Sequence, residues 1–382
     1  MKILQIIPNL TKGGAERLCL DTCHFLNKQP GIEVRLVLLH PVIKYDISSF
    51  TFPIKQISAS VHLSISGQHV LFVDELQKYI DDYAPDVIHT HLFEAEIVSR
   101  AVNYPDARWF SHCHDNMRQF RPFDWRTITQ RKLLTNYLER RFLLKRYKHN
   151  GGNTFLAISN STAQYFRKVL PRSLASVKVF PNAIDYRRFY SPSAKKKSFL
   201  GEGLNLVSVG SLLENKNHVF QIEVVKILID TGIQVKLKII GDGMTTREKI
   251  LHKIKEYELE SNVELLGNIN NVEKHLWQSD VFIHSAFSEA FGLVLIEAMA
   301  AGLPVVSLDG GGNRDIMNNG KNGFLITEHN ASLFAQKVIE LYQNPALYDA
   351  MRAYAQHFAM DYDIESYVLK LLNLYQNSDA NI

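Results

Sequence analysis

Two glutamates, Glu289 and Glu297, flank the start of a predicted helix that follows a short apolar run. The run ends near His284, and we expect the helix to begin around Phe291. Gly292 lies at that start, where the first backbone N–H groups lack helical partners and attract an anion such as a diphosphate. The segment is therefore a candidate anion site. The alternative is that Glu289 only favours the helix N-terminus and that Glu297 is a solvated helix residue.

Two loops offer further groups that suit a phosphate. Gly13 and Gly14 follow the apolar run 2–8 and enter a predicted helix, and Lys216 lies in the loop after the run 204–210. Glycine lets the backbone approach a phosphate closely, and a helix start supplies N–H donors. The first loop lacks the G-x-G-x-x-G pattern of dinucleotide-binding folds. A plain turn and a solvated lysine are the respective alternatives.

His112 and His114 enclose Cys113 at the end of the apolar run 108–114. We predict no metal site here, because a short H-C-H run directs alternate side chains to opposite faces of a strand, and no distant ligand set is evident. His114 stays a candidate functional residue, with an ordinary structural histidine as the alternative.

Two more glycine-containing segments follow apolar runs. Gly241 and Gly243 come after the run 235–241, and three glycines stand at 310–312 after the run 303–308. Simple turns at the ends of strands are the alternative to a binding role for either segment.

Short apolar runs that alternate with longer amphipathic segments predict the elements that position these residues. Such alternation indicates α/β domains with parallel sheets, in which ligands bind at the carboxyl ends of the strands. The runs of the first half are 2–8, 34–40, 86–91, 108–114, 155–159 and 177–182. Those of the second half are 204–210, 235–241, 263–267, 280–284, 303–308 and 323–326.

The length of 382 residues exceeds what one hydrophobic core usually supports. We therefore predict two doubly wound Rossmann-like domains that face a central cleft. The predicted parts are a first domain at 1–190, a linker at 191–203, a second domain at 204–360 and a helical tail at 361–382 that crosses back to the first domain.

Composition narrows the class of protein. Apolar residues make up 46% and charged residues 21% of the chain, which is typical of globular proteins. No apolar run reaches the length of a membrane-spanning helix, and three cysteines form no disulfide framework, so we expect a cytoplasmic location. No motif for nucleic-acid binding is found, and we expect no nucleic-acid partner.

The run SEAFGLVLIEAMAAGLPVV, which contains Glu289 and Glu297, resembles the E-x7-E motif of the family-4 retaining glycosyltransferases with the GT-B fold. The resemblance implies that Glu289 contacts the donor sugar and that Glu297 holds the ribose hydroxyls. Phe291, Gly292 and Leu293 would line the donor site beside them. The two-domain layout of nearly the whole chain is similar to that family as well.

The same resemblance implies roles for the other candidates. Lys216 would neutralise the donor diphosphate, and Ser211 stands where the family commonly has an arginine, which removes one fixed positive charge. His114 would lie near the donor sugar and, with Glu289 and Lys216, would form the catalytic set. The remaining donor-binding positions that the family implies are Gly13, Gly14, Gly241 and Gly243.

The resemblance further implies a retaining, metal-independent hexosyltransferase that uses a UDP- or GDP-linked sugar and has no cofactor. The implied acceptor is a saccharide that is linked to a lipid, in bacterial surface polysaccharide synthesis. The alternatives are another GT-B enzyme, such as a nucleotide-sugar epimerase, and a non-catalytic partner subunit that keeps the fold.

Positive charge is concentrated in the first half of the chain, where residues 1–190 carry a net charge of +10 within a total of +4. Residues 117–149 alone contain ten lysines and arginines, together with Phe120, Phe123 and Trp125. This segment predicts that the protein docks peripherally on the inner face of an anionic membrane. An ordinary packed helix with a charged outer face is the alternative.

Overall fold

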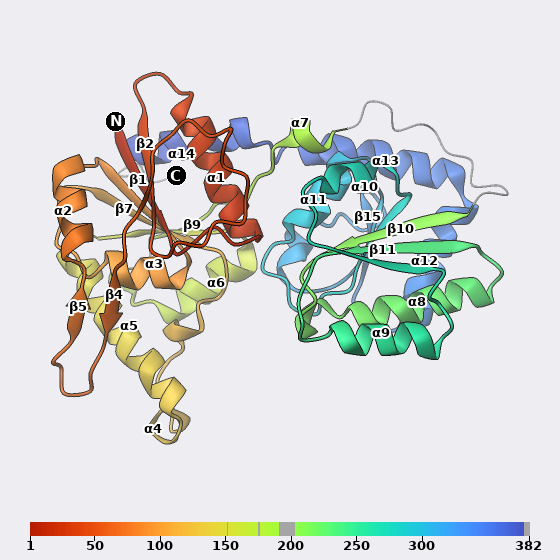
Figure 1. Cartoon of the computed structure of the whole chain (residues 1–382), viewed down its shortest axis with the longest axis horizontal. Helices are drawn as coiled ribbons and strands as arrows, with labels where there is room; N and C mark the ends of the chain where they lie inside the picture. The colour runs from red at the N-terminus through yellow and green to blue at the C-terminus, as the bar shows by residue number, and fades with distance from the viewer. Residues whose placement is uncertain (151, 175, 191–202, 378–382) are drawn as a thin grey trace. The chain divides into compact units, whose positions relative to one another are not determined.

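The computed structural model describes residues 1–382 except 151, 175, 191–202 and 378–382. Figure 1 shows two compact units, each with its own sheet. The first unit combines Met1–Asn182 with the segment that begins at Ile364, and the second unit is Ala183–Asp363. The predicted linker at 191–203 lies outside the described residues, apart from Gly203.

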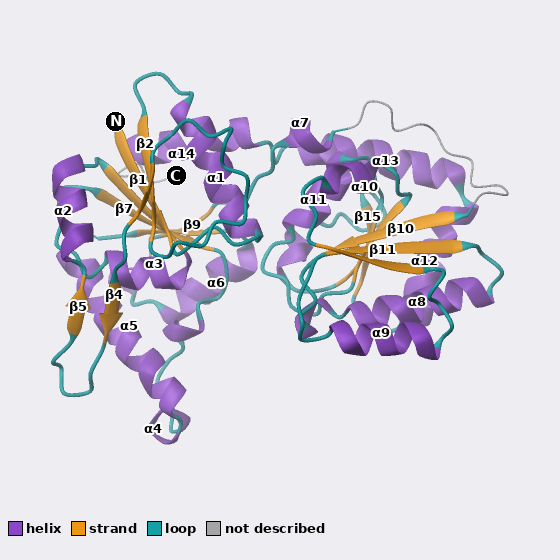
Figure 2. Cartoon of the chain, viewed as in Figure 1, coloured by secondary structure: helices purple, strands orange, loops and turns teal. Residues whose placement is uncertain are grey.

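The first unit is built on a seven-stranded parallel sheet with the strand order β3-β2-β1-β6-β7-β8-β9. Helices cover both faces of this sheet (Figure 2), as expected for a doubly wound domain. A separate antiparallel hairpin is formed by β4 and β5. The elements are β1 (Lys2–Ile7), α1 (Gly14–Asn27), β2 (Glu33–Leu38), β3 (Ile54–Gln56), β4 (Ser60–His62), β5 (Val70–Phe72), α2 (Asp74–Tyr83), β6 (Val87–His91), α3 (Leu92–Ser99), β7 (Arg108–Cys113), α4 (Arg126–Thr129), α5 (Arg131–His149), β8 (Thr154–Ala157), α6 (Asn160–Val169), β9 (Val177–Val179) and α14 (Ile364–Gln376).

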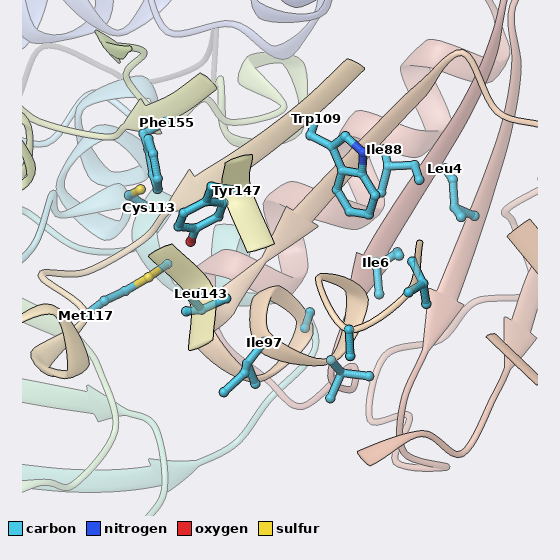
Figure 3. Close-up of a cluster of buried hydrophobic side chains, with 14 of the residues drawn as sticks. Leu4, Ile6, Ile88, Ile97, Trp109, Cys113, Met117, Leu143, Tyr147 and Phe155 are labelled. Atoms are coloured by element: carbon cyan, nitrogen blue, oxygen red, sulfur yellow. The ribbon is translucent and has the colours of Figure 1, made fainter. Parts of the chain in front are cut away.

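The central strands β1 and β6 are buried along nearly their whole length, because both faces of the sheet are covered. Figure 3 shows one of the two layers, in which Trp109, Tyr147 and Phe155 pack with aliphatic side chains of β1, β6 and α3. Cys113 belongs to this apolar layer and is fully buried. Its neighbours in sequence, His112 and His114, therefore project from the other face of β7, because side chains alternate along a strand.

The second unit has a six-stranded parallel sheet with the order β12-β11-β10-β13-β14-β15. This is the strand order of a dinucleotide-binding Rossmann domain, with a switch point between β10 and β13. The elements are α7 (Tyr186–Phe189), β10 (Leu204–Val209), α8 (His218–Asp230), β11 (Val235–Ile240), α9 (Arg247–Glu256), β12 (Val263–Gly267), α10 (Val272–Trp277), β13 (Val281–His284), α11 (Leu293–Ala300), β14 (Val305–Leu308), β15 (Gly323–Ile326), α12 (Ala331–Gln343) and α13 (Pro345–Met360).

The division between the units falls after Asn182 and not after residue 190. The physical reason is that α7 is bound to the second unit. The Arg188 guanidinium forms an ion pair with Glu273 at 3.0 Å, and the Trp277 indole donates to the Phe189 carbonyl at 2.7 Å. The tail, predicted to cross back to the first domain, contains α14, which packs against α1 and is part of the first unit.

Candidate active site

In the second unit, two loops meet at the carboxyl ends of β10 and β13, the neighbouring strands at the switch point. The Ser285 hydroxyl lies 2.8 Å from the Lys216 carbonyl and 2.9 Å from the Asn217 carbonyl. The Phe287 N–H donates to the Asn215 carbonyl at 3.1 Å. These bonds fix the loop that carries Lys216 against the loop that carries Glu289.

Lys216 and Glu289 form an ion pair in which Nζ and Oε2 are 2.6 Å apart. The two side chains are 20% and 13% exposed, so the pair is largely shielded from water. The His284 Nε2 lies 3.3 Å from the same carboxylate oxygen and is buried. A lysine, a carboxylate and an imidazole thus converge at the end of β13.

The pKa of Glu289 reflects these neighbours. Burial acts to raise the pKa, but the contact with His284 and the charge of Lys216 outweigh it and lower the pKa to about 2. The carboxylate is therefore ionised at every physiological pH. It is available as a negatively charged hydrogen-bond acceptor and not as a proton donor.

The three glycines at 310–312 hold the backbone of Glu289. The Glu289 N–H donates to the Gly310 carbonyl, and the Gly312 N–H donates to the Glu289 carbonyl, both at 2.8 Å. A Cβ on Gly312 would lie 2.0 Å from the Ala290 carbonyl oxygen, and one on Gly310 would lie 2.8 Å from the Glu289 Cβ. This close approach requires glycine at both positions. The presence of these glycines is therefore explained without a direct contact to a ligand.

Gly241 and Gly243 have a similar explanation. Gly241 has a φ of +141°, and a Cβ there would lie 2.0 Å from the Gly210 carbonyl oxygen. A Cβ on Gly243 would lie 3.0 Å from the Leu212 carbonyl oxygen. Both glycines let the loop after β11 pass closely beside the loop that contains Ser211, whose side chain is exposed.

Helix α11 begins at Leu293, and Gly292 precedes it as N-cap with a φ of +101°. This is two residues later than the sequence predicted. Phe291 is only 2% exposed, and its ring packs against Tyr362 at 6.0 Å, so this side chain belongs to the core. Glu297 lies one turn after Leu293 on α11, and both side chains are partly exposed.

In the first unit, Gly13 is the N-cap of α1 and Gly14 is its first residue. The Tyr45 hydroxyl bonds both the N–H and the carbonyl of Gly13, at 3.1 and 2.8 Å. Glu16 folds back so that its Oε2 would lie 2.4 Å from a Cβ on Gly13. A carboxylate therefore already faces the loop that the sequence suggested for phosphate binding.

His114 lies at the end of β7 in a group of four histidines. Its Nε2 is 3.0 Å from the His91 Nδ1, and its ring stacks on His112 with centroids 4.4 Å apart. Burial, supported by the neighbouring imidazoles, lowers the pKa of His114 well below its usual range. The ring is therefore neutral, and it is 9% exposed.

The predicted residues thus fall into two sets. Lys216 and Glu289 are in contact, and Ser211, Gly241 and Gly243 line the adjoining loops of the second unit. His114, Gly13 and Gly14 belong to the first unit.

Sequence reasoning missed His284 and the histidines of β6. The signal for the latter was present, because His89 and His91 have the same two-residue spacing as His112 and His114.

Two sequence families match the chain. "Glycosyltransferase Family 4" matches residues 12–188, and "Glycosyl transferases group 1" matches residues 192–358. The chain is 25% identical to "Putative glycosyltransferase EpsD" of Bacillus subtilis (strain 168), over 81% of this chain and 88% of that protein. It is 23% identical to "Capsular polysaccharide biosynthesis glycosyltransferase CapH" of Staphylococcus aureus, over 78% of each chain.

The solved structures agree on the fold. Anabaena Alr3699/HepE in complex with UDP superposes with a TM-score of 0.78 at 20% identity, over 98% of this chain and all of that one. Two Rossmann-like units, with a charged site at the switch point of the second, are the architecture of the GT-B fold. With both of its halves matched, the chain belongs to glycosyltransferase family 4.

Within the part of the chain that the structure describes, no helix is both long enough and apolar enough to cross a membrane.

Proposed function

We propose that this chain transfers a hexose from a UDP- or GDP-linked sugar to an acceptor hydroxyl with retention of the anomeric configuration. The observation that carries the proposal is the Lys216–Glu289 ion pair at the carboxyl ends of β10 and β13. It supplies a fixed positive charge for a leaving diphosphate and a fixed negative charge for sugar hydroxyls, side by side. HepE, the structural neighbour, is known in complex with UDP.

In the proposed reaction the bond between the anomeric carbon and the donor phosphate oxygen breaks. The acceptor oxygen bonds to the same carbon from the same face, and its proton passes to the departing phosphate oxygen. Lys216 and the backbone N–H groups that follow Gly292 offset the charge of the diphosphate, in place of a divalent ion. Glu289 binds sugar hydroxyls, and Glu297 binds the ribose diol.

Turnover with a panel of nucleotide sugars tests this proposal. Lys216→Ala should lower kcat on the order of 100-fold, because its charge matters most as the diphosphate leaves. Lys226→Ala is the matched control, since Lys226 lies on α8 of the same unit and pairs with the exposed Asp230 of that helix. Near-normal turnover by Lys216→Ala, or no turnover of any donor by the unmodified chain, would count against the proposal.

We further propose a bacterial surface polysaccharide as the setting and a lipid-linked saccharide as the acceptor. CapH is named for capsular polysaccharide biosynthesis, which supports the setting. A lipid-linked acceptor requires that the enzyme reach the membrane surface from the cytoplasmic side.

A basic pocket in the first unit supports this membrane contact. The pocket has a volume of about 550 Å³ and lies between the β4–β5 loop and α5. Arg141, Lys145 and Arg146 line it from α5, and His69 lines it from the loop. In Figure 1 the β4–β5 hairpin and α4 extend from the same side of this unit.

Exposed apolar side chains accompany the pocket. Ile65, at the tip of the hairpin, is 73% exposed, and Trp125, beside α4, is 71% exposed. Cations near an anionic bilayer each contribute about 1 kcal/mol, and aromatic side chains favour the interface. We propose that this side of the first unit binds an anionic membrane.

Co-sedimentation with vesicles tests the membrane proposal. The chain should bind vesicles that contain anionic lipid better than neutral ones at low salt, and R141E/K145E should lose that preference. K255E/K274E reverses two exposed lysines of the second unit and should leave it unchanged. Equal binding to anionic and neutral vesicles would contradict membrane docking while leaving the transferase proposal intact.

A further inference from the structure

Four histidines, of which His114 was described above, form one layer on the face of the first sheet opposite the Cys113 layer. His89 and His91 come from β6, and His112 comes from β7, where His91 and His112 are paired in register. Their exposed fractions are 0%, 1% and 0%. The rings stack, with centroids of the His89–His91 and His91–His112 pairs 4.6 and 5.2 Å apart. One ring nitrogen from each of these three residues lies within 4.8 Å of the other two.

Each of the three rings uses one nitrogen to bond a neutral polar group. The His89 Nδ1 is 2.5 Å from the Tyr375 hydroxyl, and the His112 Nε2 is 3.2 Å from the Asn182 Oδ1. The His91 Nε2 is 2.7 Å from the Gln5 Oε1. This is the arrangement of a metal-binding histidine, which donates from one ring nitrogen to an oxygen and keeps the other nitrogen for the ion.

The second ring nitrogen of His89 and of His112 has a different environment from that of His91. The His89 Nε2 and the His112 Nδ1 are buried and have no hydrogen-bond partner among the described residues. The His91 Nδ1 differs, because it lies 3.0 Å from the His114 Nε2, within hydrogen-bond distance. A buried polar atom without a partner costs free energy, so a buried ligand that binds these two nitrogens would remove that cost.

We propose that His89, His91 and His112 bind a divalent late-transition ion of the Zn²⁺ class. Neutral imidazoles suit such an ion, whereas Mg²⁺ and Ca²⁺ require oxygen ligands. Metal–nitrogen bonds of about 2.0 Å in tetrahedral geometry bring the nitrogens to roughly 3.3 Å from one another, so the rings close inward on binding. His91 gives up either its Gln5 or its His114 contact to join.

The ion would join β6 to β7 through side chains and fix the ring of His91 next to His114. It belongs to the first unit, whereas the residues proposed to hold the donor diphosphate belong to the second. None of the three proposed ligands is among the residues proposed above to hold the donor diphosphate. The sequence did not suggest it because the H-C-H run alone supplies too few ligands, and only the pairing of β6 with β7 adds the others.

Titration of the chelator-treated full chain with Co²⁺, followed by visible absorption, tests the site. We expect one equivalent of Co²⁺ to bind with the absorption of a low-coordinate nitrogen site, and Zn²⁺ to displace it. His89→Gln and His112→Gln should each weaken Co²⁺ binding about 100-fold or more. This loss exceeds that expected when only a hydrogen-bond partner of a ligating histidine is removed. His62→Gln, an exposed histidine of the same unit, should bind as the unmodified chain does.

Circular dichroism of the metal-free variants separates lost ligands from lost folding. If a glutamine variant does not fold, Tyr375→Phe decides, because it keeps the ring and removes only the hydroxyl beside the His89 Nδ1. It should weaken Co²⁺ binding about 10-fold. Absence of stoichiometric Co²⁺ binding, or titrations of the folded variants that match the unmodified chain, would overturn the proposal.

Discussion

At the scale of single residues, the pairing of Lys216 with Glu289 is the most informative contact. Burying two charges carries a desolvation cost, and a buried ion pair is by itself weak support for stability. This pair lies in loops at the carboxyl end of a sheet, where α/β folds bind their ligands, and not in the apolar core. A binding role explains it better than a stabilising one.

Protonation of Glu289 should destabilise the second unit. The folded pKa of about 2 lies below the ordinary value of 4.5, so the unfolded chain binds more protons between these values. The stabilisation is complete above pH 4.5 and is lost as the pH falls toward 2. Thermal unfolding should therefore show that the native chain is more stable than Glu289→Gln by an amount that is constant at neutral pH and shrinks in acid. A difference that does not change with pH would contradict the depressed pKa.

Glu297 should matter for the nucleotide and much less for the fold. If its carboxylate accepts hydrogen bonds from the ribose diol, Glu297→Ala should lose roughly 1.5–3 kcal/mol of binding free energy. Calorimetric titration with UDP and GDP measures this loss. Glu340→Ala, on the exposed face of α12, is the control and should bind as the native chain does. Unchanged affinity in Glu297→Ala would exclude the ribose contact.

Glu289, Lys216 and the glycines could be predicted from the sequence, because each belongs to a motif within a short stretch of chain. The environment of Glu289 could not be predicted in this way. His284 is close in sequence, but its contact with the carboxylate depends on the turn after β13. The histidine layer depends on which strand pairs with β7 and in which register, and neither is fixed by local sequence.

At the scale of elements, glycines shape the site by close backbone contact. The loop at 310–312 pairs with Glu289 as a short parallel bridge, and the loop after β11 passes against the loop after β10. Both contacts involve carbonyl oxygens where a Cβ would collide. The main role of these glycine segments is therefore to let neighbouring loops pack closely, which positions residues such as Glu289.

Gly312→Ala should displace Glu289, because the added Cβ would lie 2.7 Å from the Glu289 carbonyl oxygen. The added Cβ would meet the Ala290 carbonyl, and the shift should cost about 1–3 kcal/mol in stability and lower kcat as Glu289 moves. Gly320→Ala is the matched control, because its φ of +80° is strained for alanine but its Cβ would meet nothing within 4 Å. Urea unfolding and turnover of both variants check this. Equal turnover in the two variants would show that the loop does not position Glu289.

The strands that position the site were predictable, because buried parallel strands are continuous apolar runs. β3, β4 and β5 were not predicted, since each is three residues long and none of their residues is fully buried. The start of α11 was predicted near Phe291, although that side chain is buried and the helix begins at Leu293. Burial of Phe291 against Tyr362 depends on a distant segment.

At the scale of the whole molecule, the first unit is discontinuous in sequence. Its last helix, α14, lies after the entire second unit, and Tyr375 on this helix bonds Gln5 of β1 and His89 of β6. The boundary predicted at residue 190 failed for a related reason, because α7 is held by contacts to α10 that sequence spacing does not reveal.

Leu371→Ala should destabilise the first unit by about 2–5 kcal/mol, because this side chain of α14 is fully buried. Leu369→Ala, on the same helix, is the control, since its side chain is 58% exposed and the change should stay within about 0.5 kcal/mol. Unfolding followed by tryptophan fluorescence reports mainly on the first unit, which contains Trp109 and Trp125. Equal stability of the two variants would show that α14 does not complete this unit.

The proposed reaction moves a hexose from a nucleotide sugar with retention of configuration. Proton NMR of the reaction mixture tests it most directly, because the anomeric signal of donor and product is followed in one sample. For each donor of the UDP- and GDP-linked panel that is turned over, we expect a product with the anomeric configuration of the donor, and a Lys216→Ala reaction that is slower on the order of 100-fold. A product of inverted configuration, or a panel in which no donor is consumed, would contradict the account.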